Sequence, residues 1–510
     1  MAQRLQNITV QAPGFAGINS QDSPVSIDQS FAATASNCII DEYGRIGARK
    51  GYEEQSSNVS FAADSRGVEA VFESLDASGD KHIFSAVDNK IYEGLDFSAT
   101  DITPAGATIT ANNWKIVSFN NHTYFYQRGH EPLIYTDSSG SGVLARHSLF
   151  ANQTTPPQAN EVIGAYGRLW AADVSGNTKT VYWSDTLQGH KWSGGTAGSL
   201  DLTTVFPTGH DEVVALAAHN GFLIIFCKRS IIIYSGAESP ATMQLHDTVE
   251  GVGCIARDSV QHTGTDIIFL SEDGVRSFSR TIQEKSMPMR DISNNVRTEL
   301  TQLVRQQTNP IKSIYSADEA FYLLSLQDSQ TVYCFDMRGT LPDGANRVTT
   351  WAGVNPRSMA LLQDGSIYFG REDGIFKYEG YQDNGTAYEM IYYSNPMNFG
   401  NSTNLKFLKK FNITVIGNVA SPTTLVWGYD YDGAYIKKAF NTQLSNTPIS
   451  EFNVSEFNIG KFSTGVDIQR PSINTSGSGT VVTIGIESTI NGAPYSIQQI
   501  DVHALLGRLI

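Results

Sequence analysis

The stretch "IIFLSEDGVRSFSR", from Ile267 to Arg280, holds two short apolar runs separated by an acid–glycine turn. The stretch "IYFGREDGIFKYEG", from Ile367 to Gly380, repeats this plan 100 residues later. Apolar runs joined by a short polar turn predict a β-hairpin. Five further hairpins of this kind begin at Ile83, Thr123, Arg168, Phe222 and Phe321.

The seven hairpins recur at steps of 40 to 54 residues, a spacing typical of propeller blades. Runs such as "FLIIF" and "IIFL" are continuously apolar, as expected of strands buried on both faces between neighbouring blades. We therefore predict an all-β fold with a β-propeller of about seven blades. Unrelated hairpins in two β-sandwiches are the alternative that this pattern leaves open.

The long step between the fifth and sixth hairpins contains a segment with helical spacing. Its apolar residues fall on one face of a helix: Ile292, Val296, Leu300, Leu303 and Val304. Asp291 or Ser293 is placed to cap the start of this segment, and Pro310 follows its end. We predict one short amphipathic helix near residues 291–307, the longest helix of the chain.

The chain divides into three predicted parts. An N-terminal docking segment at 1–58 precedes the propeller at 59–385, and a C-terminal antiparallel β-sandwich follows at 386–510. The first part is too short and too polar to bury a core of its own, so we expect it to lie along another domain or subunit. The last part alternates apolar and polar residues between turns, and one of its expected strands lies in residues 451–462.

The formal net charge of the 510-residue chain is −15, and no basic tail or Lys/Arg stripe occurs. This argues against a protein that binds nucleic acid tightly, because tight binding requires basic residues that neutralise the phosphates. No run has the form of a signal peptide or a membrane span. Cys38, Cys227, Cys254 and Cys334 form no paired motif, so we expect buried free thiols in a reducing compartment.

The sequence does not predict an enzyme. Adjacent acids in "SEDG" (Ser271–Gly274) and "REDG" (Arg371–Gly374) lie in predicted turns, whereas glycosidase carboxylates must face each other across a substrate. The ten histidines are scattered, and no metal-binding or phosphate-binding motif occurs. We expect no catalytic residue, no cofactor and no metal ligand.

The N-terminal spacing "Asn37…Asp41…Gly44-Arg45-Ile46…Arg49-Lys50-Gly51" resembles the start of a known family. These are the tail nozzle, or tail-hub, proteins of short-tailed bacteriophages, also called packaged-DNA stabilisation proteins. The resemblance continues through Gly167–Trp192 and Gly479–Arg508, so it touches both ends and the middle of the chain. It implies a β-propeller with additional β domains, in the subunit of a ring.

The resemblance also implies partners and a location. The ring would be a hexamer below the portal and adaptor rings of the virion tail, assembled in the bacterial host cytoplasm. It would retain the packaged genome and then let double-stranded DNA leave without specific binding, with tail fibres as further partners. Arg45, Arg49, Lys50 and Arg508 lie in the matching stretches and are candidate contacts to neighbouring subunits or to the adaptor.

A receptor- or glycan-binding propeller, acting as a tail adhesin, is the second hypothesis. Aromatic residues such as Trp170, Trp183 and Trp192 would then line a pocket of the propeller. Their places in or beside predicted strands favour core packing instead. On the nozzle hypothesis, removal of residues 1–55 is expected to prevent attachment to the upper ring and to leave the propeller folded.

Overall fold

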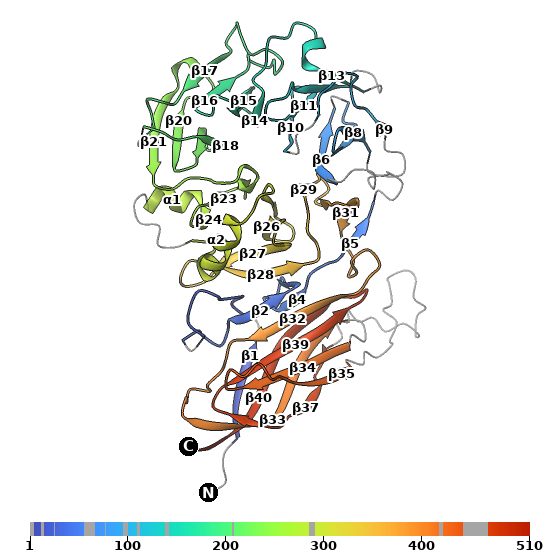
Figure 1. Cartoon of the computed structure of the whole chain (residues 1–510), viewed down its shortest axis with the longest axis vertical. Coiled ribbons are helices and arrows are strands. Elements are labelled where there is room, and N and C mark those ends of the chain that lie inside the picture. Colours follow the sequence, from blue (N-terminus) through green and yellow to red (C-terminus); the bar gives the residue numbers. More distant parts are fainter. Residues whose placement is uncertain are drawn as a thin grey trace, which may run out of the picture.

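A computed structural model describes residues 5–11, 15–24, 26–55, 67–76, 78–94, 100–109, 113–137, 142–206, 209–284, 291–417, 422–441 and 468–509. These residues form a ring of small sheets above a pair of stacked sheets (Figure 1). Both chain ends lie at the far end of the stacked pair. The fold is all-β, as the sequence predicts.

All seven predicted hairpins are present, and each belongs to one sheet of the ring. They are β7 (Lys81–Val87) with β8 (Lys90–Glu93), β11 (His122–Tyr126) with β12 (Leu133–Thr136), β15 (Arg168–Val174) with β16 (Thr180–Trp183), β19 (Phe222–Cys227) with β20 (Ser230–Ser235), β23 (Ile267–Ser271) with β24 (Gly274–Ser277), β26 (Phe321–Leu326) with β27 (Thr331–Thr340), and β30 (Ile367–Gly370) with β31 (Ile375–Tyr378).

Each hairpin pairs with one further strand on the inner side of the ring. These inner strands are β6 (Val68–Leu75), β10 (Lys115–Phe119), β14 (Ala159–Ala165), β18 (Val213–His219), β22 (Gln261–His262), β25 (Lys312–Ser316) and β29 (Ser358–Leu361). The outer strands are β9 (Thr100–Asp101), β13 (Val143–Arg146), β17 (Gly198–Asp201), β21 (Gln244–Glu250), β28 (Asn346–Ala352) and β5 (Tyr52–Glu54). Each inner strand contacts the next one around the ring, from β6 through to β29 and back to β6. Between β18 and β25 the 3-10 helix η4 (Arg257–Ser259) makes these contacts.

Alternate side chains of one strand enter two different cores, as the continuously apolar runs predict. In β19, Leu223 and Ile225 pack in the cluster shared with β15 and β16. Ile224 and Phe226 point to the opposite face and pack against Phe269 of β23. The same strand is therefore buried on both sides because a neighbouring blade covers each face.

The number of blades differs from the expected seven. Six blades are sheets of their own, five with four strands and one with three, β22 to β24. The sixth repeat in chain order, β25 to β28, continues into a nine-stranded sheet, because the outer strand β28 joins β2 (Ala32–Ser36) through the parallel pair Ser36 and Thr350. The propeller thus has six separate blades, and the remaining repeat connects it to the lower sheets.

The last blade is completed by the N-terminal segment. Strand β5 pairs antiparallel with β31, with Tyr52 opposite Tyr378. The ring of Tyr52 packs edge-on against Phe376 at 5.2 Å between centroids. A strand from the start of the chain therefore closes the ring that the end of the propeller sequence leaves open.

The lower part consists of two sheets. One contains β3 (Cys38–Ile40), β4 (Ile46–Ala48), β40 (Tyr495–Leu509), β33 (Asn404–Gly417), β36 (Ile468–Gln469), β37 (Ser472–Asn474), β38 (Ser478–Gly479) and β1 (Leu5–Gln11). The other continues from β28 and β2 through β32 (Tyr388–Ser394), β39 (Val482–Ile490), β34 (Pro422–Tyr429) and β35 (Ile436–Asn441). The N-terminal strands thus lie along both the propeller and the lower sheets.

The two lower sheets share one core, as a sandwich requires. Val482, Ile484 and Ile486 of β39 are buried there, together with Phe411 of β33. The Phe411 ring lies 6.5 Å from Trp427 of the opposite sheet. The strand expected at residues 451–462 lies outside the described residues.

The predicted helix is present but starts later than expected. The described helices are α1 (Phe278–Glu284), α2 (Arg297–Arg305) and the 3-10 turns η2 (His147–Leu149), η3 (Pro240–Thr242), η4 and η5 (Asn294–Val296). Neither expected cap is used: Ser293 Oγ accepts the N–H of Val275, and Asp291 forms an ion pair with Arg297 at 2.7 Å. The capping interpretation is wrong because both side chains serve contacts with other groups.

Among the described residues, neither helix has the length and apolarity needed to cross a membrane. The four cysteines are buried and unpaired, which confirms the prediction of buried free thiols. Burial raises the pKa of the Cys254 thiol to about 12, so it stays protonated and unreactive at neutral pH.

Candidate functional site

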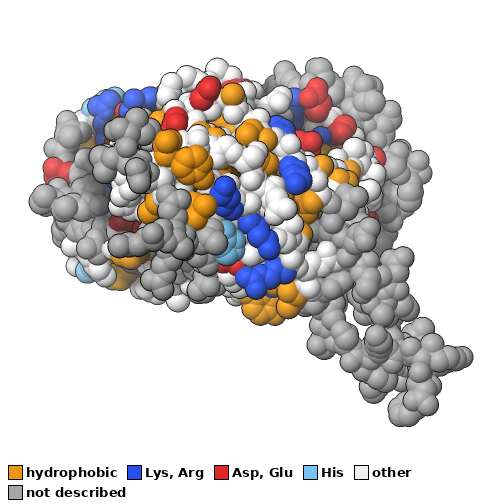
Figure 2. Space-filling view, turned by 90° about the horizontal axis from the view of Figure 1, so that it is seen from below, with side chains coloured by type: hydrophobic (Ala, Val, Ile, Leu, Met, Phe, Trp, Pro, Cys, Tyr) orange, Lys and Arg blue, Asp and Glu red, His pale blue; other side chains and the backbone are white. Residues whose placement is uncertain are grey.

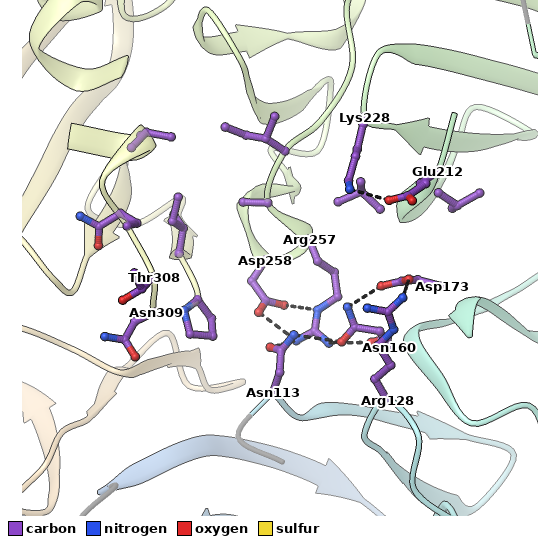
Figure 3. Close-up of a pocket in the computed structure, with 18 residues that line it drawn as sticks. Asn113, Arg128, Asn160, Asp173, Glu212, Lys228, Arg257, Asp258, Thr308 and Asn309 are labelled. Atoms are coloured by element: carbon purple, nitrogen blue, oxygen red, sulfur yellow. Dashed lines mark hydrogen bonds and ion pairs between the residues drawn. The ribbon is translucent and has the colours of Figure 1, made fainter. Parts of the chain in front are cut away.

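A pocket of about 410 Å³ lies where the inner strands of the propeller begin. The segments leading into β10, β14, β18 and β25 converge there around η4 (Figure 3). Propellers commonly place binding sites at such a position, so its side chains decide what the ring can do.

Arg257 of η4 is the centre of this site. Its guanidinium donates to the carbonyl and the Oδ1 of Asn160, to Asn113 Oδ1 and to the Trp114 carbonyl, at 2.5 to 2.9 Å. Its Nε also donates to Asp258 Oδ1 at 2.8 Å. Figure 3 shows Asn113, Asn160 and Asp258 gathered around the Arg257 side chain. The arginine therefore ties several blades together at the axis.

Asp258 is held between two cations. Its Oδ2 lies 2.6 Å from Lys312 Nζ of β25. Burial alone would raise the pKa of Asp258, but Arg257 and Lys312 outweigh burial and hold that pKa well below its usual range. The carboxylate is thus ionised at all ordinary pH values and cannot act as a general acid near neutrality.

Glu161 extends the same network. Its carboxylate is buried, lies 3.0 Å from Lys115 of β10 and accepts the backbone N–H of Leu216 in β18 at 3.3 Å. Burial raises the pKa of Glu161, while Lys115 and Arg257 oppose that shift. The side chain sits in β14, so its contacts connect three consecutive blades.

The rim of the pocket is paired in the same way. Arg128 forms an ion pair with Asp173 at 2.8 Å, and Lys228 forms one with Glu212 at 2.5 Å. Among the described lining residues, each charged side chain has an oppositely charged neighbour within this chain. These pairs stabilise the ring and neutralise the charges that line the pocket.

A second pocket, of about 160 Å³, is lined by Lys115, Asp258 and Lys312 among others. Asp258 lines both pockets, so the ion-pair network stands between them. Paired side chains of Arg257, Asp258 and Lys312 therefore occupy part of the space between the inner strands.

The structure places the four predicted contact residues in different settings. Arg49 is fully buried and forms an ion pair with Asp383 at 2.7 Å, so its guanidinium serves the interior of this chain. Arg45 is mostly buried beside Asp41. Lys50 contacts Glu319 and keeps 39% of its side chain exposed. Arg508 belongs to β40, and its side chain lies outside the described residues.

The aromatic residues proposed for a glycan pocket are core residues. Trp170, Trp183 and Trp192 are buried, and none lines either pocket. The acids Asp273 and Glu372 of the two repeated turns are exposed at 61% and 72%, in separate hairpins. The core and turn interpretations of the sequence are confirmed for these residues.

Sequence reasoning missed a group of lysines on the sandwich. Lys409 and Lys410 of β33 and Lys438 of β35 are exposed. Lys410 pairs in register with Asn474, whose carbonyl accepts Lys438 Nζ at 3.2 Å, so a lysine of each sheet neighbours this residue of β37. Figure 2 shows the end of the molecule that carries the sandwich, where Lys and Arg side chains run across the described face. The adjacent "KK" pairs of the sequence were the available signal for this group of lysines.

Comparison with known proteins finds no matching family model and no matching curated protein. Among solved structures, the chain resembles the extracellular domain of a hybrid two-component system from B. thetaiotaomicron, at 11% identity and a TM-score of 0.43. That match covers 67% of this chain and 41% of the other. The WD40 domain of Toxoplasma gondii coronin matches at 10% identity and a TM-score of 0.38, over 68% and 86% of the two chains.

A third similar structure is PorZ of the type-IX secretion system of Porphyromonas gingivalis, at 13% identity and a TM-score of 0.34. It covers 74% of this chain and 45% of PorZ. The chain therefore spans less than half the length of two of these three proteins. The fold therefore supports a propeller-type domain with a binding or structural role.

Proposed function

We propose that the chain is a structural subunit of a bacteriophage tail nozzle, a virion protein without enzymatic activity. Several copies, six by the family resemblance, would form a ring below the portal and adaptor rings. The ring would retain the packaged genome and serve as its exit channel. The observation that carries this proposal is the internal pairing of the charged side chains of the axial pocket, which suits a scaffold better than an active site.

The ion-pair network also bears on where the channel of such a nozzle would lie. The side chains of Arg257 and Asp258 stand among the inner strands of one propeller. DNA would therefore pass between subunits, along a lumen that several chains surround. The net charge of −15 per chain favours a lumen that repels the phosphate backbone and does not trap it.

The lysine group of the sandwich, Lys409, Lys410 and Lys438, is the part of this acidic chain best suited to dock on an acidic neighbour. Charge complementarity of this kind guides association and fixes the register of partners. We assign this face to contacts within the tail, with the adaptor, with tail fibres or with the next subunit.

The experiment is the native mass of the full chain, measured alone and after mixing with the adaptor ring of the same phage. A discrete hexamer, alone or on addition of the adaptor, supports the proposal. The double variant Lys409→Glu/Lys410→Glu should weaken assembly, whereas Lys228→Glu, an exposed lysine of the propeller, should not. A chain that stays monomeric with the adaptor present would refute the nozzle, and binding to a glycan array would then favour the adhesin.

A further inference from the structure

A compact set of metal-ligand atoms lies between the first two blades, away from the axial pocket. Asp76 follows β6, His82 lies in β7, and Asp137 follows β12 of the next blade. One oxygen of each carboxylate and a ring nitrogen of His82 all lie within 4.8 Å of one another. Three such atoms from two blades meet here without any sequence motif.

The imidazole of His82 is oriented by its surroundings. Its Nδ1 lies 2.8 Å from Glu93 Oε1, and the Tyr135 hydroxyl donates to the same oxygen at 2.8 Å. Because a carboxylate can only accept, Nδ1 carries the hydrogen, and Nε2 is the ring nitrogen that faces the two aspartates. A carboxylate on the far nitrogen is the usual support of a metal-bound histidine.

No hydrogen bond to Nε2 is present among the described residues. The Nε2 atom is buried without a hydrogen-bond partner, and the His82 side chain is 11% exposed. Asp137 Oδ2 at 3.6 Å and Asp76 Oδ2 at 4.0 Å are both too distant for a hydrogen bond to Nε2. Ligand atoms at about 2.0–2.2 Å from one ion stand roughly 3–3.5 Å apart, so a small inward movement of the two carboxylates would bring all three atoms onto one ion.

The two carboxylates are buried and aimed at this gap. The side chains of Asp137 and Asp76 are 4% and 8% exposed. The Oδ1 of Asp76 accepts the backbone N–H groups of Ser78 and Asp80 at 2.9 and 2.7 Å, which fixes the carboxylate and turns Oδ2 toward His82. Buried carboxylates this close to one another repel unless a cation lies between them.

We propose that Asp76, His82 and Asp137 bind a divalent transition-metal cation of the Zn²⁺ or Mn²⁺ class, with Glu93 as the positioning group for His82. One nitrogen and two carboxylate oxygens suit these ions, whereas Mg²⁺ and Ca²⁺ prefer oxygen ligands throughout. The ion joins the first blade to the second and so reinforces the propeller at a point far from its axis. This inference holds whether or not the chain forms a ring.

The test is calorimetric titration of Zn²⁺, and separately Mn²⁺, into the full chain after treatment with EDTA and dialysis. We expect one site per chain, lost in His82→Gln and in Asp137→Asn. Glu93→Ala should retain the site with an affinity roughly 10–100-fold weaker. His122→Gln is the matched control. His122 lies in the neighbouring strand β11, and its Nδ1 contacts the hydroxyl of Thr136, whereas Nδ1 of His82 contacts a carboxylate.

Thermal unfolding of the same proteins gives a second readout. Bound metal should raise the Tm of the wild-type chain and of His122→Gln, and leave that of Asp137→Asn unchanged. Circular dichroism without metal shows whether each variant folds. If wild type binds neither ion, or if the variants bind as wild type does, the proposal is overturned.

Discussion

Arg49 holds both carboxylate oxygens of Asp383, with Nη1 2.8 Å from Oδ1 and Nη2 2.7 Å from Oδ2. The guanidinium also lies 4.2 Å above the ring of Tyr388. Asp383 stands between the last blade and β32, the first strand of the sandwich. An arginine of the N-terminal segment therefore fixes the junction of the two parts of the chain.

The variant Arg49→Gln should be strongly destabilised. It leaves Asp383 partly buried without its cation, and breaking a buried pair in this way costs about 3–5 kcal/mol. The free energy of unfolding in urea measures the loss. Lys437→Gln is the control, because it removes an exposed ion pair with Glu487, which is worth about 1 kcal/mol at most. Equal stability of the two variants would contradict this role of Arg49.

Removal of residues 1–55 should disrupt the propeller, contrary to the expectation from sequence. The truncation deletes β5, which leaves β31 as an open edge and uncovers the ring of Phe376. We expect loss of the near-ultraviolet circular dichroism signal and aggregation. A shorter truncation, residues 1–11, removes β1 alone and should leave the propeller folded. Retention of the native signal by the longer truncation would show that β5 is dispensable.

Gly51→Ala tests the closure of the ring by β5 with the addition of a single methyl group. A Cβ at Gly51 would lie 1.9 Å from the carbonyl oxygen of Gln382, a backbone atom that cannot rotate away. Overpacking of this kind costs about 1–3 kcal/mol, and we expect the upper end of that range. Gly339→Ala is the control, since nothing lies within 4 Å of its Cβ position. Unfolding midpoints of the two variants should differ accordingly.

The hairpins were predictable because their signal is local. Each places two apolar runs around a polar turn within some fifteen residues, and the structure pairs them as expected. The junction of propeller and sandwich was not predictable, because one parallel pair, Ser36 with Thr350, extends the β28 sheet into the lower part. Such a contact joins distant residues and leaves no periodic trace in the sequence.

The candidate sites were hidden for the same reason. Arg257 gains its role from Asn113 and Asn160, which are 144 and 97 residues away in the chain. His82 meets Asp137 only because the two blades are neighbours. The resemblance singled out the arginines of the N-terminal segment. It could not predict the burial of Arg49, because arginine is rarely buried unless it is paired, and its partner is far away in the sequence.

Arg257→Gln should weaken the whole propeller. Glu161 and Asp258 would remain buried with one cation fewer, at a cost of about 3–5 kcal/mol. Arg128→Gln is the matched control, an arginine of the same pocket that is 44% exposed and pairs with Asp173. Urea unfolding should show a large loss for the first variant and about 1 kcal/mol or less for the second. Comparable losses would mean that the axis does not hold the blades together.

The stability of the propeller should fall between pH 7 and pH 5 because of His147. This side chain is fully buried, and both ring nitrogens lack a hydrogen-bond partner. Burial lowers the pKa of His147 to about 4, with His190 and Glu131 as its charged or titratable neighbours. Above pH 6.5 the imidazole is neutral in the folded and the unfolded chain, so it contributes no pH dependence there.

As the pH falls through 6.5, the unfolded chain takes up a proton that the folded chain refuses until about pH 4. The free energy of unfolding should therefore drop by about 2 kcal/mol from pH 7 to pH 5 through this group alone. His147→Leu removes the titrating ring and fills a similar volume, so its pH dependence should be smaller by that amount. Parallel pH profiles of wild type and variant would mean that His147 is already protonated, or solvated, in the folded chain.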